Sequence, residues 1–217
     1  MHAINLWMIS LLLVTAIVVL LQMTRRHSIG FLYAAPWPPL ARGLLAIIVI
    51  DGWLYLFHRT EHWALPLWRF HRVHHSDDQV DTTTALRFHV GEKLLSLCAT
   101  ALFLIPLVGF QLKDLLLYEI CYQPFNLLHH SNLTLPERWD RIIRLVFVSP
   151  NMHRVHHSQQ REETNSNYSN LLSIWDRLAG TFRLRSELQT LKYGLPEFSE
   201  PRWQTIWGML NTPLASV

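Results

Sequence analysis

Four apolar runs divide the chain, and polar stretches separate them. The runs cover residues 4–23, 43–57, 94–110 and 115–128. The first has about 20 residues without a charge, which matches the thickness of a bilayer core. It is longer than the apolar core of a signal peptide, and Arg25–Arg26 follows it instead of a small-residue cleavage site. We therefore predict an uncleaved membrane-spanning helix and three further spans, the last two short enough for a hairpin that does not fully cross.

The segments between the runs indicate how the spans connect. Pro36, Pro38 and Pro39 exclude a helix interior between the first two runs, and a short turn at residues 109–114 joins the last two. Residues 58–93 and 129–183 hold no run of spanning length and predict a helical cap. The expected fold is all-α, a single domain over residues 1–217 with about four transmembrane helices in two hairpins and this cap.

Composition supports a membrane protein. Charged residues make up only 16% of the 217 positions, against roughly 25% in soluble domains. Cys98 and Cys121 fall in predicted spans, where we expect small apolar packing residues instead of a disulfide. The formal net charge of +3 requires no nucleic-acid partner, because basic residues beside an anionic leaflet account for it.

The candidate chemistry lies in the histidines. The chain has 13, and only His2 and His27 lie outside residues 58–157. The pentapeptide H-R-V-H-H occurs twice, at 71–75 and at 153–157, and His58 and His62 form an H-x-x-x-H pair. Residues three and four apart share one face of a helix. Each box therefore directs two or three imidazoles to one place, as metal binding requires.

The number of imidazoles predicts two metal ions, because one ion takes about four to six ligands. Imidazole suits zinc, iron, copper and nickel alike, so the residues alone leave the ion open. The metal candidates are His58, His62, His71, His74, His75, His89, His130, His153, His156 and His157.

Ligand histidines need partners for their second nitrogen. We expect these partners, or other supporting groups around the site, among Asp51, Asp77, Asp81, Glu92, Asn167 and Asp176. Asp51 lies inside the second apolar run, where an ionisable group is costly. It either orients a ligand histidine, lines a substrate path, or pairs with a polar group such as Arg42.

A shared metal site requires all boxes on one side of the membrane. The second span leads into His58, the third begins just after His89, and the fourth ends at His129–His130. Fifteen of the 19 lysines and arginines then lie on the side of the boxes. The positive-inside rule places that side in the cytoplasm, at a bacterial inner membrane or an ER-type membrane.

The ordered motifs resemble the sterol desaturase / fatty acid hydroxylase superfamily of integral-membrane di-iron enzymes. The resemblance covers about residues 51–183, and its motifs are H-R-T-E-H at 58–62, H-R-V-H-H-S at 71–76, R-F-H at 87–89 with Glu92, H-S-N at 130–132, S-P-N-M-H-R-V-H-H-S at 149–158, T-N-S-N-Y at 164–168 and L-S-I-W-D-R-L-A-G-T-F at 172–182. Val90 stands where the family has proline after the histidine at 89. Asn126 stands where some members have a further histidine, and His129 is its possible substitute.

The resemblance implies an enzyme that uses O2 to hydroxylate an unactivated C–H bond of a membrane lipid. It implies two iron ions, with zinc as the substitute ion, in a cytosolic cap. By matching position, the catalytic ligands are His58, His62, His71, His74, His75, His130, His153, His156 and His157. The chain has no Gly-rich nucleotide fingerprint and no evident haem or flavin domain. Electrons are therefore expected from a separate ferredoxin- or cytochrome b5-like donor with its reductase.

Other functions remain open at this point. A desaturase would use the same site, and the sequence does not separate it from a hydroxylase. A non-catalytic metal protein or a transporter would also bind metal, although a transporter needs ligands along the membrane depth. A zinc hydrolase would need only three histidines and a carboxylate base. The sequence does not identify the lipid.

Overall fold

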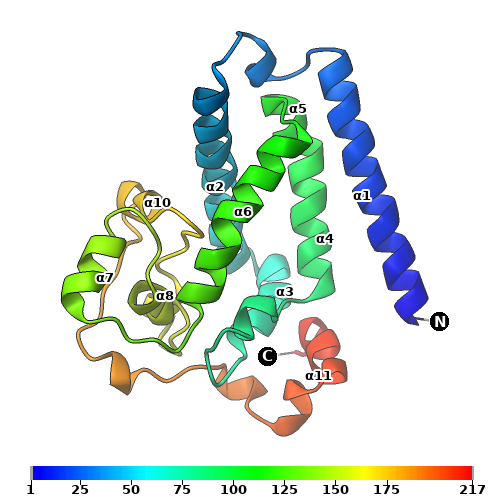
Figure 1. The fold of residues 1–217 in the computed structure, drawn as a ribbon. Helices are drawn as coiled ribbons and strands as arrows, with labels where there is room; N and C mark the ends of the chain where they lie inside the picture. The colour runs from blue at the N-terminus through cyan, green and yellow to red at the C-terminus, as the bar shows by residue number, and fades with distance from the viewer. Residues whose placement is uncertain (1, 217) are drawn as a thin grey trace. The chain divides into compact units, whose positions relative to one another are not determined.

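The computed structural model describes the backbone of residues 2–216 and the side chains of residues 12–216. The described chain is helical and contains no strand, only two isolated β-bridges, which confirms the all-α prediction. The α-helices (Figure 1) are α1 His2–Arg26, α2 Pro39–Trp63, α3 Leu65–His75, α4 Val90–Ala99, α5 Ile105–Val108, α6 Leu112–His129, α7 Glu137–Ile143, α8 Pro150–His156, α9 Arg161–Thr164, α10 Ile174–Leu178 and α11 Ile206–Asn211.

Three helical segments are long and apolar enough, by length and composition, to cross a membrane. They are Leu12–Tyr33, Pro39–Trp63 and Val90–Val108. These segments agree with the first three expected spans. Helix α6 covers the fourth expected span, but it carries Lys113, Asp114 and Glu119 within 18 residues. Its crossing of the membrane stays a prediction.

The third segment changes its helical geometry in the middle. Helix α4 ends at Ala99, a π-helical turn occupies Thr100–Leu104, and α5 follows. Pro106 lies in the first turn of α5. Proline lacks an N–H, and its ring clashes with the carbonyl four residues earlier. The wider turn before Pro106 accommodates this clash.

The described residues form two compact units. The first contains the residues up to Ile50 together with Leu95–Ile120, and Arg42 is its central polar residue. Its Nη2 lies 2.7 Å from Asp114 Oδ2 and also donates to Gly109 O, while Nη1 donates to Leu32 O. Arg42, one of the groups that the sequence offered to Asp51, thus pairs with Asp114 and ties the ends of three segments together.

The second unit contains Asp51–Leu94 and the residues from Cys121 onward, and it holds every histidine of the boxes. Asp51 is fully buried there. Its carboxylate accepts the backbone N–H groups of Leu171 and Leu172 at 3.0 and 2.9 Å and the Trp175 Nε1–H at 2.8 Å. The acidic group inside α2 therefore anchors the loop that precedes α10.

A variant tests the role of Arg42 in the first unit. Arg42→Met would leave Asp114 charged and buried without its cation, which costs about 3–5 kcal/mol in comparable cases. We expect a clearly lower midpoint of thermal unfolding in detergent, followed by circular dichroism. Lys113→Met removes an exposed cation next to Asp114 and is the matched control. Equal midpoints for the two variants would contradict a structural role for the buried pair.

Candidate metal centre

Four helical segments of the second unit bring nine histidines together. The nine form two groups, one of five histidines and one of four. In each group, the ring nitrogens that could bind a metal all lie within 4.8 Å of one another. The first group is His58, His62, His71, His75 and His156, and the second group is His74, His130, His153 and His157. All are buried except His62, which is half-buried. These nine are the residues that the motifs predicted as catalytic ligands.

Each H-R-V-H-H box serves both groups. In α3 the pair four residues apart, His71 and His75, belongs to the first group, whereas His74 belongs to the second. At α8 the arrangement is reversed, since His153 and His157 belong to the second group and His156 to the first. Around the helix axis, the fifth residue of a box lies about 40° from the first residue, whereas the fourth residue lies about 60° from the first in the opposite direction. One box therefore spans two adjacent sites.

The nitrogens within each group are very close. In the first group, His71 Nε2 lies 3.1 Å from His58 Nε2 and 3.2 Å from His75 Nε2. In the second group, the successive Nε2 distances from His74 through His130 and His153 to His157 are 3.2, 3.0 and 3.1 Å. Two ligands of one ion, each about 2.1 Å away, stand roughly 3.0 Å apart at a right angle and roughly 3.4 Å apart at a tetrahedral angle. The spacing fits neighbouring ligands of one ion.

Each of these rings also has an outer nitrogen, Nδ1, which points away from the other histidines of its group. The hydrogen-bond partners of these outer nitrogens show where two rings of the first group carry their protons. His58 Nδ1 lies 2.8 Å from Tyr168 O, and His71 Nδ1 lies 3.1 Å from Glu92 Oε1. A carbonyl and a carboxylate only accept, so each Nδ1 carries the hydrogen and each neutral ring has a bare lone pair on Nε2. These two lone pairs face each other at 3.1 Å. While both rings are neutral they cannot hydrogen-bond to each other, and a cation between them would remove the repulsion.

The second group repeats this arrangement. His74 Nδ1 donates to Arg87 O at 3.2 Å, and His130 Nδ1 donates to Asn126 O at 2.8 Å. Their Nε2 atoms therefore face each other as lone pairs at 3.2 Å. In the first group, the buried Nε2 atoms of His62 and His156 have no hydrogen-bond partner among the described residues. The donor set of both groups fits a metal ion.

Burial keeps these imidazoles neutral, which is the state that binds metal. Desolvation lowers the pKa of His156 to about 3 and that of His130 to about 4. It also lowers the pKa of His74, His75, His153 and His157 well below the usual value. His71 is the exception: burial opposes its charged form, but Glu92 and Glu61 outweigh burial and raise its pKa.

Of the expected supporting groups, Glu92 makes a direct hydrogen bond to a histidine of the two groups, namely His71. The hydrogen bonds of the other groups hold nearby loops. Asp176 accepts from the backbone of Tyr168 and Ser169, and Asn167 joins Met152 O to the backbone of Arg183. Asp77 accepts from Thr84, and Asp81 accepts from Thr83. Asp51 anchors Leu171, Leu172 and Trp175 as described above. These contacts fix the backbone that carries the carbonyl acceptors.

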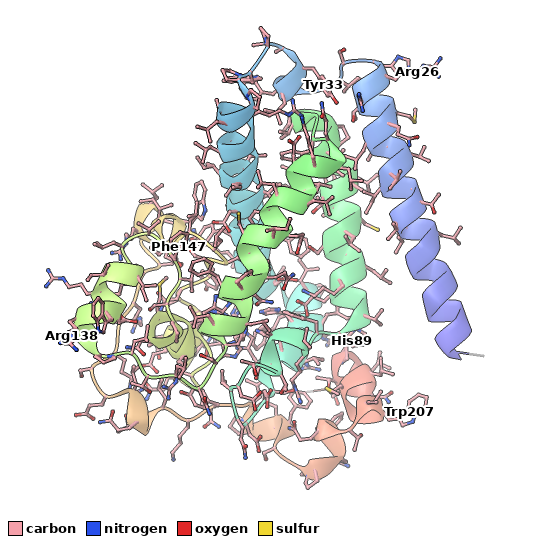
Figure 2. All side chains as sticks on the ribbon, in the orientation of Figure 1. Arg26, Tyr33, His89, Arg138, Phe147 and Trp207 are labelled. Atoms are coloured by element: carbon pink, nitrogen blue, oxygen red, sulfur yellow. The ribbon has the colours of Figure 1, made fainter. Side chains whose placement is uncertain are left out.

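Two further histidines lie outside both groups. His89, labelled in Figure 2, lies just before α4, where its Nδ1 accepts the Gly91 N–H at 2.9 Å and its Nε2 is 3.3 Å from Leu210 O. Both ring nitrogens thus face other partners, and its ligand role stays a prediction. His129 is buried with its ring centroid 4.2 Å from that of His153, but it belongs to neither group.

Sequence reasoning missed two features of the site. Tyr168 packs its ring against those of His58, His62 and His156, at centroid distances of 5.7, 5.0 and 5.8 Å. Most of the outer acceptors are backbone carbonyls, which include Ser166 O for His156. The motif T-N-S-N-Y at 164–168 was the available signal for the first group, since it contains Tyr168 and the carbonyl of Ser166.

Membrane-spanning helices joined to a buried double group of histidines define a histidine-box membrane protein. A model of the fatty acid hydroxylase family matches residues 43–181, more than half of the chain. The chain belongs to this family and is an integral membrane protein.

Several curated relatives are similar. Ornithine lipid hydroxylase OlsE of Rhizobium tropici is 36% identical over 67% of this chain and 43% of its own length. Alkylglycerol monooxygenase of Homo sapiens is 31% identical over 76% of this chain and 35% of its own. Fatty acid hydroxylase vlmA of a Lecanicillium species is 30% identical over 64% of this chain and 41% of its own length. The chain spans less than half the length of these relatives. No solved structure matches the chain significantly.

The lowered pKa values predict how the metal-free protein responds to acid. Unfolded histidines titrate near 6.5, whereas His130 and His156 titrate at about 4 and about 3 in the fold. Between these values the unfolded chain binds more protons, so stability falls as the pH decreases from about 6.5 toward 4. The raised pKa of His71 acts in the opposite direction, but for one group only.

The measurement is thermal unfolding of chelator-treated protein over this pH range. We expect the midpoint to decrease steadily below pH 6.5, and His156→Gln to weaken the dependence. His27→Gln, which removes an exposed histidine outside the groups, is the control. A midpoint that stays constant between pH 6.5 and 4.5 would show that the buried rings do not resist protonation.

Proposed function

We propose that this protein hydroxylates a C–H bond of a membrane lipid with O2, at two iron ions held by the two groups of histidines. The observation that carries the proposal is the pair of adjacent histidine groups with Nε2 lone pairs directed at one another. The names of the relatives, which are lipid hydroxylases and monooxygenases, support lipid hydroxylation. The overall reaction consumes the lipid, O2, two electrons and two protons, and it gives the hydroxylated lipid and water.

The first group would hold one ion and the second group the other. Nine imidazoles exceed the three that a catalytic zinc site uses, and imidazole is a good ligand for iron. When bound, the irons supply the redox chemistry that O2 activation requires. Zinc could replace iron in such a nitrogen-rich site, because imidazole is also a good ligand for zinc.

The chain's own residues orient the ligands and shield them from water. The carbonyls of Tyr168, Ser166, Asn126 and Arg87 and the carboxylate of Glu92 each hold one ligand ring in its tautomer. The ring of Tyr168 covers one side of the first group. Phe88 stacks on His74 in the second group with a centroid distance of 4.5 Å. Exclusion of water protects an oxidising site from side reactions.

The electrons would come from a separate protein, because no nucleotide, haem or flavin motif is recognisable in the sequence. A ferredoxin- or cytochrome b5-like donor with its reductase fits this requirement. The distribution of lysines and arginines supports a cytoplasmic position of the metal centre, where such donors and reductants are present.

Metal analysis tests the ligand assignment. Protein purified after expression with iron should contain two iron ions per chain. His75→Gln removes a ligand of the first group and His157→Gln a ligand of the second, so each should lower the content to about one. His89→Gln should retain two ions, because His89 lies outside both groups. Loss of iron in His89→Gln would instead make His89 a ligand, and full occupancy in both group variants would refute the assignment.

Isotope labelling tests the reaction. Cells that express the protein with an electron donor are grown under 18O2, and their lipids are compared by mass spectrometry with those of cells expressing His156→Ala. A lipid that gains one 18O with the wild type and with His89→Ala, but not with His156→Ala, is the expected result. A lipid that loses two hydrogens without label would identify a desaturase. No difference between the lipids would count against the oxygenase.

A further inference from the structure

A cavity lies next to the first group of histidines. Its volume is about 600 Å³, and both of its main walls belong to the second unit. One wall is a face of α2 that carries Arg59 and Thr60 and reaches His62, and the other carries Arg161, Asn165 and Tyr168. Arg161 and Asn165 are four residues apart at α9, so they point to the same side.

The charge of this cavity is one-sided. Arg59 and Arg161 line it, and no acidic residue is found among its described lining residues. Neither guanidinium has an ion pair in the described part of the chain, whereas other arginines do. Arg185, for example, lies 2.9 Å from Glu163, and Arg144 pairs with Glu137 and Asp140. The two cavity arginines thus have donors and charge available for a ligand.

The cavity reaches one of the proposed metal ligands. His62 lines the cavity and belongs to the first group. Its Nδ1 donates to Asn165 Oδ1 at 3.3 Å, and Asn165 also lines the cavity. Arg59 precedes His62 by three residues, which is about 4.5 Å along the helix axis. A ligand bound to Arg59 therefore lies beside the group at which oxidation is proposed.

We propose that Arg59 and Arg161 bind the anionic headgroup, phosphate or carboxylate, of the lipid that the site oxidises. This inference rests on the proposed function, since it names the substrate class of the same site. Guanidinium binds phosphate and carboxylate oxygens through two parallel hydrogen bonds, which a lysine cannot reproduce. Two unpaired arginines on opposite walls can hold such a headgroup while the alkyl chain lies along the apolar surface.

Lipid binding to the iron-loaded full chain in phosphatidylcholine nanodiscs tests the proposal without turnover. The probes share a 16-carbon chain: dipalmitoyl phosphatidic acid, palmitate and the uncharged 1-O-hexadecylglycerol, with inorganic phosphate as competitor. The variants are Arg59→Gln, Arg161→Gln, both together, and Arg59→Lys. Arg69→Gln, at an exposed arginine of α3 outside this cavity, is the matched control. Iron content and unfolding temperature show whether each variant is folded.

We expect Arg59→Gln and Arg161→Gln each to weaken binding of one or both anionic lipids about 10- to 100-fold. This is the range of a lost charge-assisted hydrogen-bond pair. Arg59→Lys should recover only part of the affinity, and Arg69→Gln and the uncharged lipid should show no change. Preference for phosphatidic acid or for palmitate identifies phosphate or carboxylate as the headgroup. Tight binding of inorganic phosphate alone would assign the site to free phosphate and overturn the proposal.

Equal binding of charged and uncharged lipids would also overturn it, as would an effect of Arg59→Gln and Arg161→Gln no larger than that of Arg69→Gln. The outcome is separable from the oxygenase activity. Arginine-dependent binding without incorporation of 18O would support the headgroup site and contradict the proposed reaction. Incorporation of 18O into an uncharged lipid by both Arg59→Gln and Arg161→Gln would support the proposed reaction and contradict the headgroup site.

Discussion

The structure of the second unit depends on one electrostatic constraint, which is the convergence of bare imidazole lone pairs in a buried space. His58 faces His71, and His74 faces His130, at 3.1 and 3.2 Å. Water is excluded there, so the repulsion is not screened as it would be at a surface. A cation in each group would turn the repulsion into coordination, and its binding free energy would become part of the free energy of folding.

The constraint explains why so many polar groups are buried beside membrane-spanning helices. The outer nitrogens of three of these histidines, His58, His74 and His156, meet backbone carbonyls of irregular segments. Such segments need their own supports. Asp51, deep in α2, holds Leu171 and Leu172, and Asp176 holds the backbone at Tyr168, whose carbonyl orients His58. A costly carboxylate within an apolar helix is thus compensated by three N–H donors.

The nine histidines that the motifs indicated converge in the structure, and helical periodicity explains why histidines three and four residues apart in one box can do so. Apolar length predicted four spans, and three helical segments of the described chain are long and apolar enough to cross a membrane. The sequence did not predict how each box divides between the two groups. His74 of the first H-R-V-H-H box lies in the second group, and His156 of the second box lies in the first group, because α3 and α8 pack against each other. It left the role of Asp51 open because two of its described donors are backbone N–H groups, which every sequence offers everywhere. Tyr168 was missed because a single aromatic residue in a loop has no periodic signature.

The two groups of histidines are not equivalent, although their boxes are nearly the same. Two divalent ions held by nine neutral imidazoles would carry a large uncompensated charge. Both carboxylates near a ligand ring, Glu92 at 3.1 Å and Glu61 at 3.8 Å, lie at His71 in the first group. Among the described contacts, the outer partners of the second group are backbone carbonyls. The two carboxylates would partly compensate a cation in the first group. The first group is also the one beside the arginine-lined cavity, so the proposed headgroup site lies next to the group that has the carboxylates.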